Sequence, residues 1–366
     1  MMIEKIINRF QGRQGAVEET HVLLKVTDPS LPFESQLSAL KAAYAEVTEG
    51  TDVLIRRFFL SDAANQKDAV SRAFSDSLAC ATSVVQQAPL DGTKFAVWVW
   101  CARGLKVEGL TASHNGYVHH FAAGLEAPGT GSEAQMGTIF QDYETELGRR
   151  EMSVAHHCVR TWIFVRDVDT NYAGVVKGRR DYFDTVGLTA RTHYIASTGI
   201  GGSFADPSQL VGMDAYAVGG LAPGQIRYLH AADHLSPTAL YGVTFERGTA
   251  VTYGDRKHVF ISGTASIDSA GQVVHPGDPV RQSERLVENV SALLAEADAG
   301  LDHVRMALVY LRDTGDYARV RAWFETRHPE LHPLFLLAPV CRPAWLVEME
   351  CFAVLPRSTG NPYPDL

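Results

Sequence analysis

The sequence repeats one order of predicted elements three times, and this repetition constrains the fold more than any other feature. The last third shows it most clearly. Its predicted elements are strands at 258–267 and 272–275, a helix from Asp278-Pro279, a strand at 304–311, a helix ending before Pro329, and strands near 334–340 and 346–354. An aspartate N-cap followed by proline favours a helix start. The predicted order is therefore β-β-α-β-α-β-β.

The middle and first thirds follow the same order. In the middle third we predict strands at 117–125, 159–165, 193–197 and 210–218, a helix starting at a capping box of Ser132 and Gln135, and a helix at 172–186. In the first third we predict a helix carrying Leu37, Leu40, Tyr44 and Val47 on one face, strands at 53–60, 81–85 and 95–100, and a helix at 67–74.

Glycine- and proline-containing stretches near residues 110 and 225 mark the expected boundaries between the repeats. We therefore predict an α+β protein of three similar units, spanning 1–110, 111–224 and 225–366. The alternative is a coincidence of a common α+β order.

Composition and charge narrow the classes of function. The net charge of -9 argues against nucleic acid as a partner, because phosphate binding needs clustered Lys and Arg. The chain lacks the apolar core of a signal peptide and an apolar run of about 20 residues, so we expect a cytoplasmic protein without membrane contact. The five cysteines form no CxxC pair, and adjacent histidines such as His119-His120 point to opposite faces of a strand, so no metal site is expected.

The last unit resembles the Rid/YjgF family in its stretches Val259-Phe-Ile-Ser-Gly-Thr-Ala-Ser266 and Leu346-Val-Glu-Met-Glu-Cys-Phe-Ala353. In that family the unit is a small α+β domain that assembles as a homotrimer, with ligand sites in the clefts between subunits. Three such units in one chain would form a covalent pseudo-trimer. This last step is inferred from the repeat rather than from the family.

The middle and last units together resemble the chorismatases, two-part Rid-like enzymes that cleave pyruvate from chorismate. The stretches that match are 160–165, 177–183, 196–202, 241–247 and 341–348. Cys341 and Glu348, seven residues apart, look like the pair found in chorismatases that release a hydroxybenzoate. The segment 229–237 does not align with these enzymes, which leaves the substrate open.

Chorismate is a dianion that carries an enol ether, and hydrolysis of this ether needs a proton delivered to the vinyl carbon. A carboxylic acid can deliver it only if burial keeps it protonated near neutral pH. Glu348 follows the apolar run Trp345-Leu-Val, so we predict it to be the general acid. Glu350 shares its face of the strand and is predicted to be structural.

The predicted anion anchors are arginines, whose planar guanidinium binds carboxylates through two hydrogen bonds. They are Arg342, Arg247, Arg160 and Arg179, any one of which could instead form an ion pair within the protein. Cys341 is expected beside the ligand ring, either shaping the product or acting as a nucleophile. Tyr241 and Tyr194 could orient the ligand, although a structural role is favoured for Tyr194.

The sequence thus predicts a cofactor-free enzyme for a small carboxylate substrate, with its cleft between the middle and last units. One alternative is imine or enamine hydrolysis of the simple Rid type, which needs one arginine and a tight pocket. Another is a carboxylate-binding protein without catalysis. An endoribonuclease role is disfavoured by the acidic balance and the absence of a histidine pair in a basic groove. We expect a monomer or weak oligomer.

Overall fold

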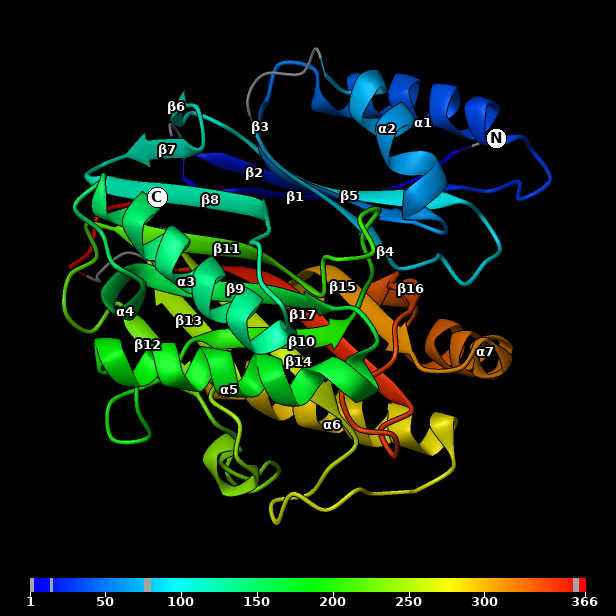
Figure 1. Ribbon diagram of the computed structural model, residues 1–366. Helices are drawn as coiled ribbons and strands as arrows, with labels where there is room; N and C mark the ends of the chain where they lie inside the picture. Colours follow the sequence, from blue (N-terminus) through cyan, green and yellow to red (C-terminus); the bar gives the residue numbers. More distant parts are fainter. Residues whose placement is uncertain (1–2, 14–15, 76–79, 358–361) are drawn as a thin grey trace.

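The computed structural model describes residues 3–13, 16–75, 80–357 and 362–366, except for the side chain of Tyr241. Three mixed β-sheets face one another, and the helices cover their outer faces (Figure 1). One hydrophobic cluster reaches into all three sheets, with Trp98, Trp162 and Leu308 among its members. The predicted α+β class with three similar units in one chain is confirmed.

The first sheet has the strand order β1-β2-β5-β3-β4, and helices α1 and α2 cover it on one side (Figure 1). Its strands are β1 (Ile3–Gln11), β2 (Glu18–Val26), β3 (Asp52–Leu60), β4 (Ala81–Gln86) and β5 (Phe95–Arg103), and its helices are α1 (Phe33–Thr48) and α2 (Ala63–Ala73). The β1–β2 hairpin was not predicted. Its edge strand β1 carries polar residues on both faces, so it lacks a clear alternating pattern.

The second sheet has the order β10-β9-β11-β8-β7-β6. Its strands are β6 (Lys106–Glu108), β7 (Thr111–His114), β8 (Tyr117–Leu125), β9 (Cys158–Val165), β10 (Ala196–Gly201) and β11 (Val211–Gly219), and its helices are α3 (Ser132–Gly148), α4 (Val154–His157) and α5 (Val168–Val186). The predicted strand at 193–197 is therefore shifted toward the C-terminus. The predicted capping box is wrong, because Ser132 lies inside α3 and Gln135 accepts hydrogen bonds from Leu210 and Val211.

The third sheet has the order β12-β13-β14-β17-β15-β16. Its strands are β12 (Ile226–Leu229), β13 (Gly248–Thr252), β14 (Arg256–Ala265), β15 (Val304–Leu311), β16 (Leu334–Leu337) and β17 (Val347–Pro356), and its helices are α6 (Pro279–Glu296) and α7 (Tyr317–Arg327). Short 3₁₀ turns lie at 238–241, 301–303, 314–316 and 329–331. Asp278 caps α6 as predicted, accepting hydrogen bonds from the N–H groups of Val280 and Arg281.

The predicted strand at 272–275 is wrong. The segment makes only one isolated bridge, between Ile267 and Val273, and the strand that pairs with β14 on this side is β13. The side chain of Asp268 explains the difference, because it accepts hydrogen bonds from the N–H groups of Ala270 and Gln272 and closes a turn.

The three units close into a ring through isolated β-bridges. Gln86 at the end of β4 pairs with Ser203 of the second unit, Ile200 of β10 pairs with Val340 of the third, and Leu336 of β16 pairs with Pro89 of the first. Each bridge joins the edge strand of one sheet to the next unit. Three junctions between units therefore lie at equivalent places around the ring.

Cross-strand register gives the correspondence between the units. Along the central antiparallel pairs, Glu350 faces Leu308, Asp214 faces Trp162, and Trp98 faces Arg57. Glu350, Asp214 and Trp98 are therefore equivalent positions. Two residues earlier on the same strands, Glu348 corresponds to Gly212 and Ala96.

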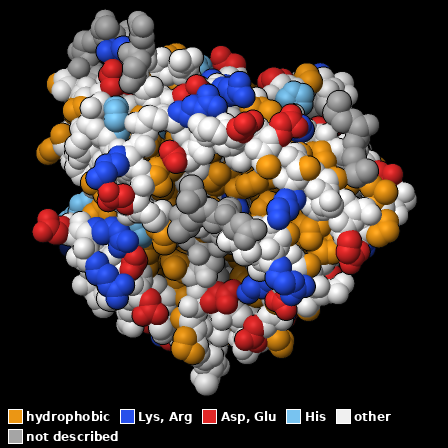
Figure 2. Space-filling view, turned by 90° about the horizontal axis from the view of Figure 1, so that it is seen from above, with side chains coloured by type: hydrophobic (Ala, Val, Ile, Leu, Met, Phe, Trp, Pro, Cys, Tyr) orange, Lys and Arg blue, Asp and Glu red, His pale blue; other side chains and the backbone are white. Residues whose placement is uncertain are grey.

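Among the described residues, no helix is long and apolar enough to cross a membrane. On the face shown in Figure 2, Lys and Arg side chains are interspersed with Asp and Glu, and apolar side chains lie between them. The basic residues on this face do not gather into one continuous patch.

Candidate active site

A cleft between the second and third units collects most of the residues predicted for the site. It encloses about 470 Å³, counting the part open to solvent. The second unit contributes α5 and β10, and the third contributes β14, β17 and the segments that precede β13 and β17. The lining residues are Tyr172, Arg179, Ser197, Gly199, Val243, Phe245, Arg247, Gly263, Ala265, Ile267, Cys341, Arg342, Trp345 and Glu348.

Glu348 is the acidic residue of this cleft. It is the second residue of β17 and is 4% exposed. Burial raises the pKa of its carboxyl to about 8, the negative charge of Glu350 adds to this, and Arg247 and Arg160 oppose it. Gly263 makes room for it, since a Cβ at that position would lie 2.1 Å from Glu348 Oε1. The carboxyl therefore holds a proton at neutral pH that it can donate.

This raised pKa predicts a pH-dependent effect of Glu348→Gln on stability. Because the folded state keeps the proton up to about pH 8 and the unfolded state releases it near 4.5, the wild type loses stability as pH rises between these values. Glutamine does not titrate. We expect the variant to gain stability over the wild type between pH 5 and 9, by on the order of 4 kcal/mol. Urea unfolding at pH 5 and at pH 9 gives the free energy of unfolding of both proteins. A difference between variant and wild type that is the same at the two pH values would contradict a protonated Glu348 carboxyl.

Two buried arginines line the cleft. Arg179 of α5 is 2% exposed, and its Nε donates to Thr244 Oγ1 at 3.1 Å and its Nη1 to Ser197 Oγ at 3.4 Å. Its Nη2 is buried without a hydrogen-bond partner among the described residues. Arg247 is 4% exposed, and its Nη2 donates to the carbonyl of Ser236 at 2.9 Å. A buried guanidinium nitrogen without a partner is a donor that suits a carboxylate ligand.

The segment before β17 adds Cys341 and Arg342. Cys341 is half-buried, and burial raises the pKa of its thiol to about 12, to which the charge of Glu348 contributes. A thiol with this pKa is protonated at neutral pH and is a poor nucleophile. Arg342 is exposed at the edge of the cleft, and its guanidinium carbon lies 5.5 Å from the centre of the Trp345 ring.

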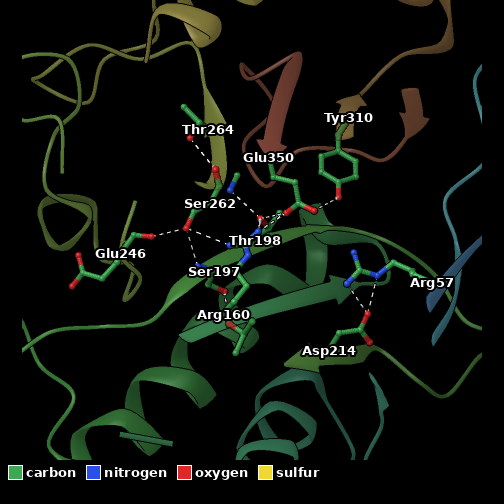
Figure 3. A network of polar contacts seen from close by, with 12 residues as sticks. Arg57, Arg160, Ser197, Thr198, Asp214, Glu246, Ser262, Thr264, Tyr310 and Glu350 are labelled. Carbon is green, nitrogen blue, oxygen red and sulfur yellow. Dashed lines mark hydrogen bonds and ion pairs between the residues drawn. The ribbon is translucent and has the colours of Figure 1, made fainter. Parts of the chain in front are cut away.

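Arg160 and Glu350 join the two units behind the cleft (Figure 3). Arg160 Nη2 donates to Glu350 Oε2 at 2.5 Å, Thr198 donates to the same oxygen, and the Tyr310 hydroxyl donates to Oε1 at 3.1 Å. Both charged side chains are almost fully buried. Arg160 is not among the residues that line the cleft, and its pairing with Glu350 is the ion pair given above as the alternative to ligand binding. The structural role predicted for Glu350 agrees with these contacts.

Of the two tyrosines predicted to orient a ligand, Tyr194 is not among the residues that line the cleft. The ring of Tyr194 stacks on Phe183 at 6.2 Å between centroids, and its backbone N–H donates to Glu246. The side chain of Tyr241 lies outside the described part of the chain. The cleft contains Tyr172 instead, which packs against Gly199 and was not selected from the sequence.

Most of the stretch 196–202, one of those that resemble the chorismatases, forms strand β10. Its Ser197 and Gly199 do line the cleft. In the described residues no group of three or more His, Cys, Asp or Glu side chains is arranged to hold a metal ion.

Three similar mixed sheets packed in a ring place the chain in the Rid-like class of α+β proteins. A family model described as endoribonuclease L-PSP matches residues 248–355. A RutC family protein of Pyrococcus abyssi is 33% identical over 97 residues, which are 26% of this chain and 76% of that protein. A RutC family protein of Drosophila melanogaster is 32% identical over 99 residues, covering 26% and 71% respectively.

The chain belongs to the Rid/YjgF/L-PSP superfamily. The 3-aminoacrylate deaminase RutC of Acinetobacter baylyi is 31% identical over 75 residues, which are 20% of this chain and 60% of that protein. The crystal structure of a chorismatase matches with a TM-score of 0.67 and 19% identity, covering 92% of this chain and 99% of that one. The similarity to the chorismatase thus extends over all three units.

Proposed function

We propose that the protein hydrolyses the enol ether of chorismate or of a closely similar enol-ether dicarboxylate and releases pyruvate. The observation that carries this proposal is the cleft itself, in which the protonated carboxyl of Glu348 lies among Arg179, Arg247 and Arg342. One acid surrounded by three cations suits a dianionic substrate that must be protonated on carbon. The fold shared with a chorismatase supports the same choice.

In the proposed reaction the arginines bind the two carboxylates, and Glu348 transfers its proton to the terminal methylene carbon of the enolpyruvyl group. The ether carbon becomes an oxocarbenium ion, and water adds to it. The added water gives one proton back to the Glu348 carboxylate. The resulting hemiketal breaks its bond to the ring oxygen and passes its hydroxyl proton to that oxygen, which leaves an alcohol and pyruvate. The Glu348 carboxylate formed in the first step faces the arginines, which stabilise its negative charge. The protonated Cys341 limits the space beside the substrate ring.

The direct test is pyruvate release from chorismate, followed with a lactate dehydrogenase coupled assay. We expect release well above the spontaneous background. Replacing Arg247 with alanine removes a carboxylate contact, and we expect KM to rise about tenfold or more, because hydrogen bonds to charged groups contribute about 1.5–3 kcal/mol. Arg227→Ala, an exposed arginine outside the cleft, is the control. Absence of release by the wild type would overturn the proposal.

The second candidate is hydrolysis of an imine or enamine acid. It is favoured by the similarity of 75 residues of the chain to the 3-aminoacrylate deaminase. A small imino acid needs one arginine, whereas three line this cleft, so we rank this function second. Ammonia release from 2-iminopropionate, generated in the assay, together with no pyruvate from chorismate, would reverse the order.

A further inference from the structure

The cleft between the third and first units is a second concave site, which we call the 3–1 cleft. It encloses about 1180 Å³, counting the part open to solvent, and is formed by β1, β2 and the segment before β5 on one side and by α7 and the segment around β16 on the other. Tyr317, Phe324 and Phe335 supply aromatic side chains to its lining. The proposed catalytic residues contribute nothing to it.

Register shows that the 3–1 cleft is the counterpart of the active cleft. Leu334 pairs with Leu308, and Thr198 pairs with Trp162, so Leu334 and Thr198 occupy equivalent positions. Phe335 and Gly199 follow them directly, and Phe335 therefore takes the place of Gly199. The helices agree with this alignment. Tyr317 contacts Phe335 with 5.7 Å between ring centroids, just as Tyr172 packs against Gly199.

The same correspondence shows that the chemistry of the active cleft has been replaced. Ile261 of β14 and Val22 of β2 occupy equivalent positions, and they pair with Gly248 and Ile7 respectively. The residue before Gly248 is Arg247 and the residue before Ile7 is Ile6, so Ile6 takes the place of Arg247. Phe324 takes the place of Arg179, since each lies seven residues after its helix tyrosine. Ala96 takes the place of Glu348. The buried arginines and the acid of the active cleft are thus apolar residues here.

The junction between the first and second units is filled at the position that corresponds to Glu348. Gly212 is the equivalent of Glu348, and a Cβ added to it would lie 2.6 Å from the ring of Phe204. Phe204 itself is 7% exposed. The 3–1 cleft is open to solvent. Between the first and second units, by contrast, the Phe204 ring occupies the space next to Gly212, the position equivalent to Glu348.

The charges that line the 3–1 cleft are acidic in balance. Lys25 is paired with Glu4 at 3.0 Å and Arg321 with Glu325 at 2.7 Å. Asp91 has no ion-pair partner among the described residues. Its Oδ1 accepts hydrogen bonds from Thr93 N at 3.1 Å and Thr93 Oγ1 at 2.6 Å. The carboxylate of Asp91 is therefore the charge that remains without an ion pair, in a cleft that is also lined by Tyr317, Phe324 and Phe335.

We propose that the 3–1 cleft binds a small organic ammonium compound with an apolar or aromatic body. The ammonium group binds to Asp91, and the body packs against Phe324, Phe335 and Ile6. A cation is attracted both by the unpaired carboxylate and by the faces of aromatic rings. An anion would have to displace Glu4 or Glu325 from its cation and would be repelled by Asp91.

The test compares two probes with the same phenyl body, phenethylamine and 3-phenylpropionate, by isothermal titration calorimetry on the full chain. We expect phenethylamine to bind and phenylpropionate to bind at least tenfold more weakly at this cleft. Asp91→Asn keeps a side-chain oxygen that accepts from Thr93 but removes the negative charge. This substitution should weaken the binding of phenethylamine at least tenfold. Asp28→Asn is the matched control, because Asp28 accepts from Ser30 in the same way outside the cleft.

Arg247→Ala separates the two clefts. Phenethylamine binding that survives this substitution and is lost in Asp91→Asn places the ligand in the 3–1 cleft. The proposal is overturned if phenethylamine does not bind, if Asp91→Asn binds it as tightly as the wild type, or if Arg247→Ala removes the binding.

Discussion

Replacing Glu348 with glutamine will reduce pyruvate release from chorismate by about 10² to 10⁴-fold, the usual contribution of a general acid. Glutamine keeps the shape of the side chain and its place beside Gly263 but has no proton to transfer to carbon. Because the chemical step is affected rather than binding, kcat should fall while KM changes little. The coupled pyruvate assay at pH 7 measures both constants.

The pH profile gives this prediction an independent check. The wild-type rate should fall as pH rises through about 8, because the acid must be protonated and burial places its pKa there. The residual rate of Glu348→Gln should not fall as pH rises through this range, because glutamine does not titrate. Glu288→Gln, an exposed glutamate outside the cleft, should retain the full rate and profile. A Glu348→Gln variant that keeps more than a tenth of the wild-type rate would exclude Glu348 as the acid.

Replacing Asp214 with asparagine will destabilise the protein by about 3–5 kcal/mol, the loss expected when one partner of a buried ion pair is removed. Arg57 of the first unit and Asp214 of the second are both completely buried, with 2.7 Å between Nη2 and Oδ2 (Figure 3). Ser83 Oγ also donates to Asp214 Oδ2, at 2.8 Å. Without the carboxylate, the guanidinium stays buried among Trp98, Trp162 and Phe164 with no countercharge.

Urea unfolding at pH 7 measures this loss. Asp181→Asn, which breaks an exposed pair with Lys177, should cost less than about 1 kcal/mol. The double variant Arg57→Leu with Asp214→Asn should lose less than the sum of the two single variants, because it leaves no buried charge. A loss below about 1 kcal/mol in Asp214→Asn would mean that the buried pair contributes little to holding the two units together.

The sequence predicted the fold where buried strands and amphipathic helices are long. Strands such as 304–311 and 159–165 are mostly apolar, and each has a neighbouring strand on both sides in its sheet. The short strands β6 and β12 at a sheet edge, and their neighbours β7 and β13, were not predicted. They have three to five residues each, and their pairing depends on partners that no local pattern shows.

The site was predicted in part for a similar reason. Glu348, Cys341, Arg342, Arg247 and Arg179 belong to stretches with recognisable motifs, and all five line one cleft. Arg160 carried the same motif signal, but its pairing with Glu350 depends on how two units meet. Tyr172 lies outside the matching stretches, and Gly263 lies inside one but was not selected as a site residue. Their roles are steric and appear only when α5 and β14 face each other across the cleft.

Closure of the ring by the bridge between Pro89 and Leu336 has a consequence for folding during synthesis. The first unit must present its inner face to a partner that the ribosome makes 237 residues later, since Arg256 binds Glu19 and His258 contacts the same carboxylate. Contacts between residues so far apart in the chain form late. Until then the part of the inner face that packs against Phe352 of the third unit, with His21 and Trp100, is exposed and open to association with another nascent chain.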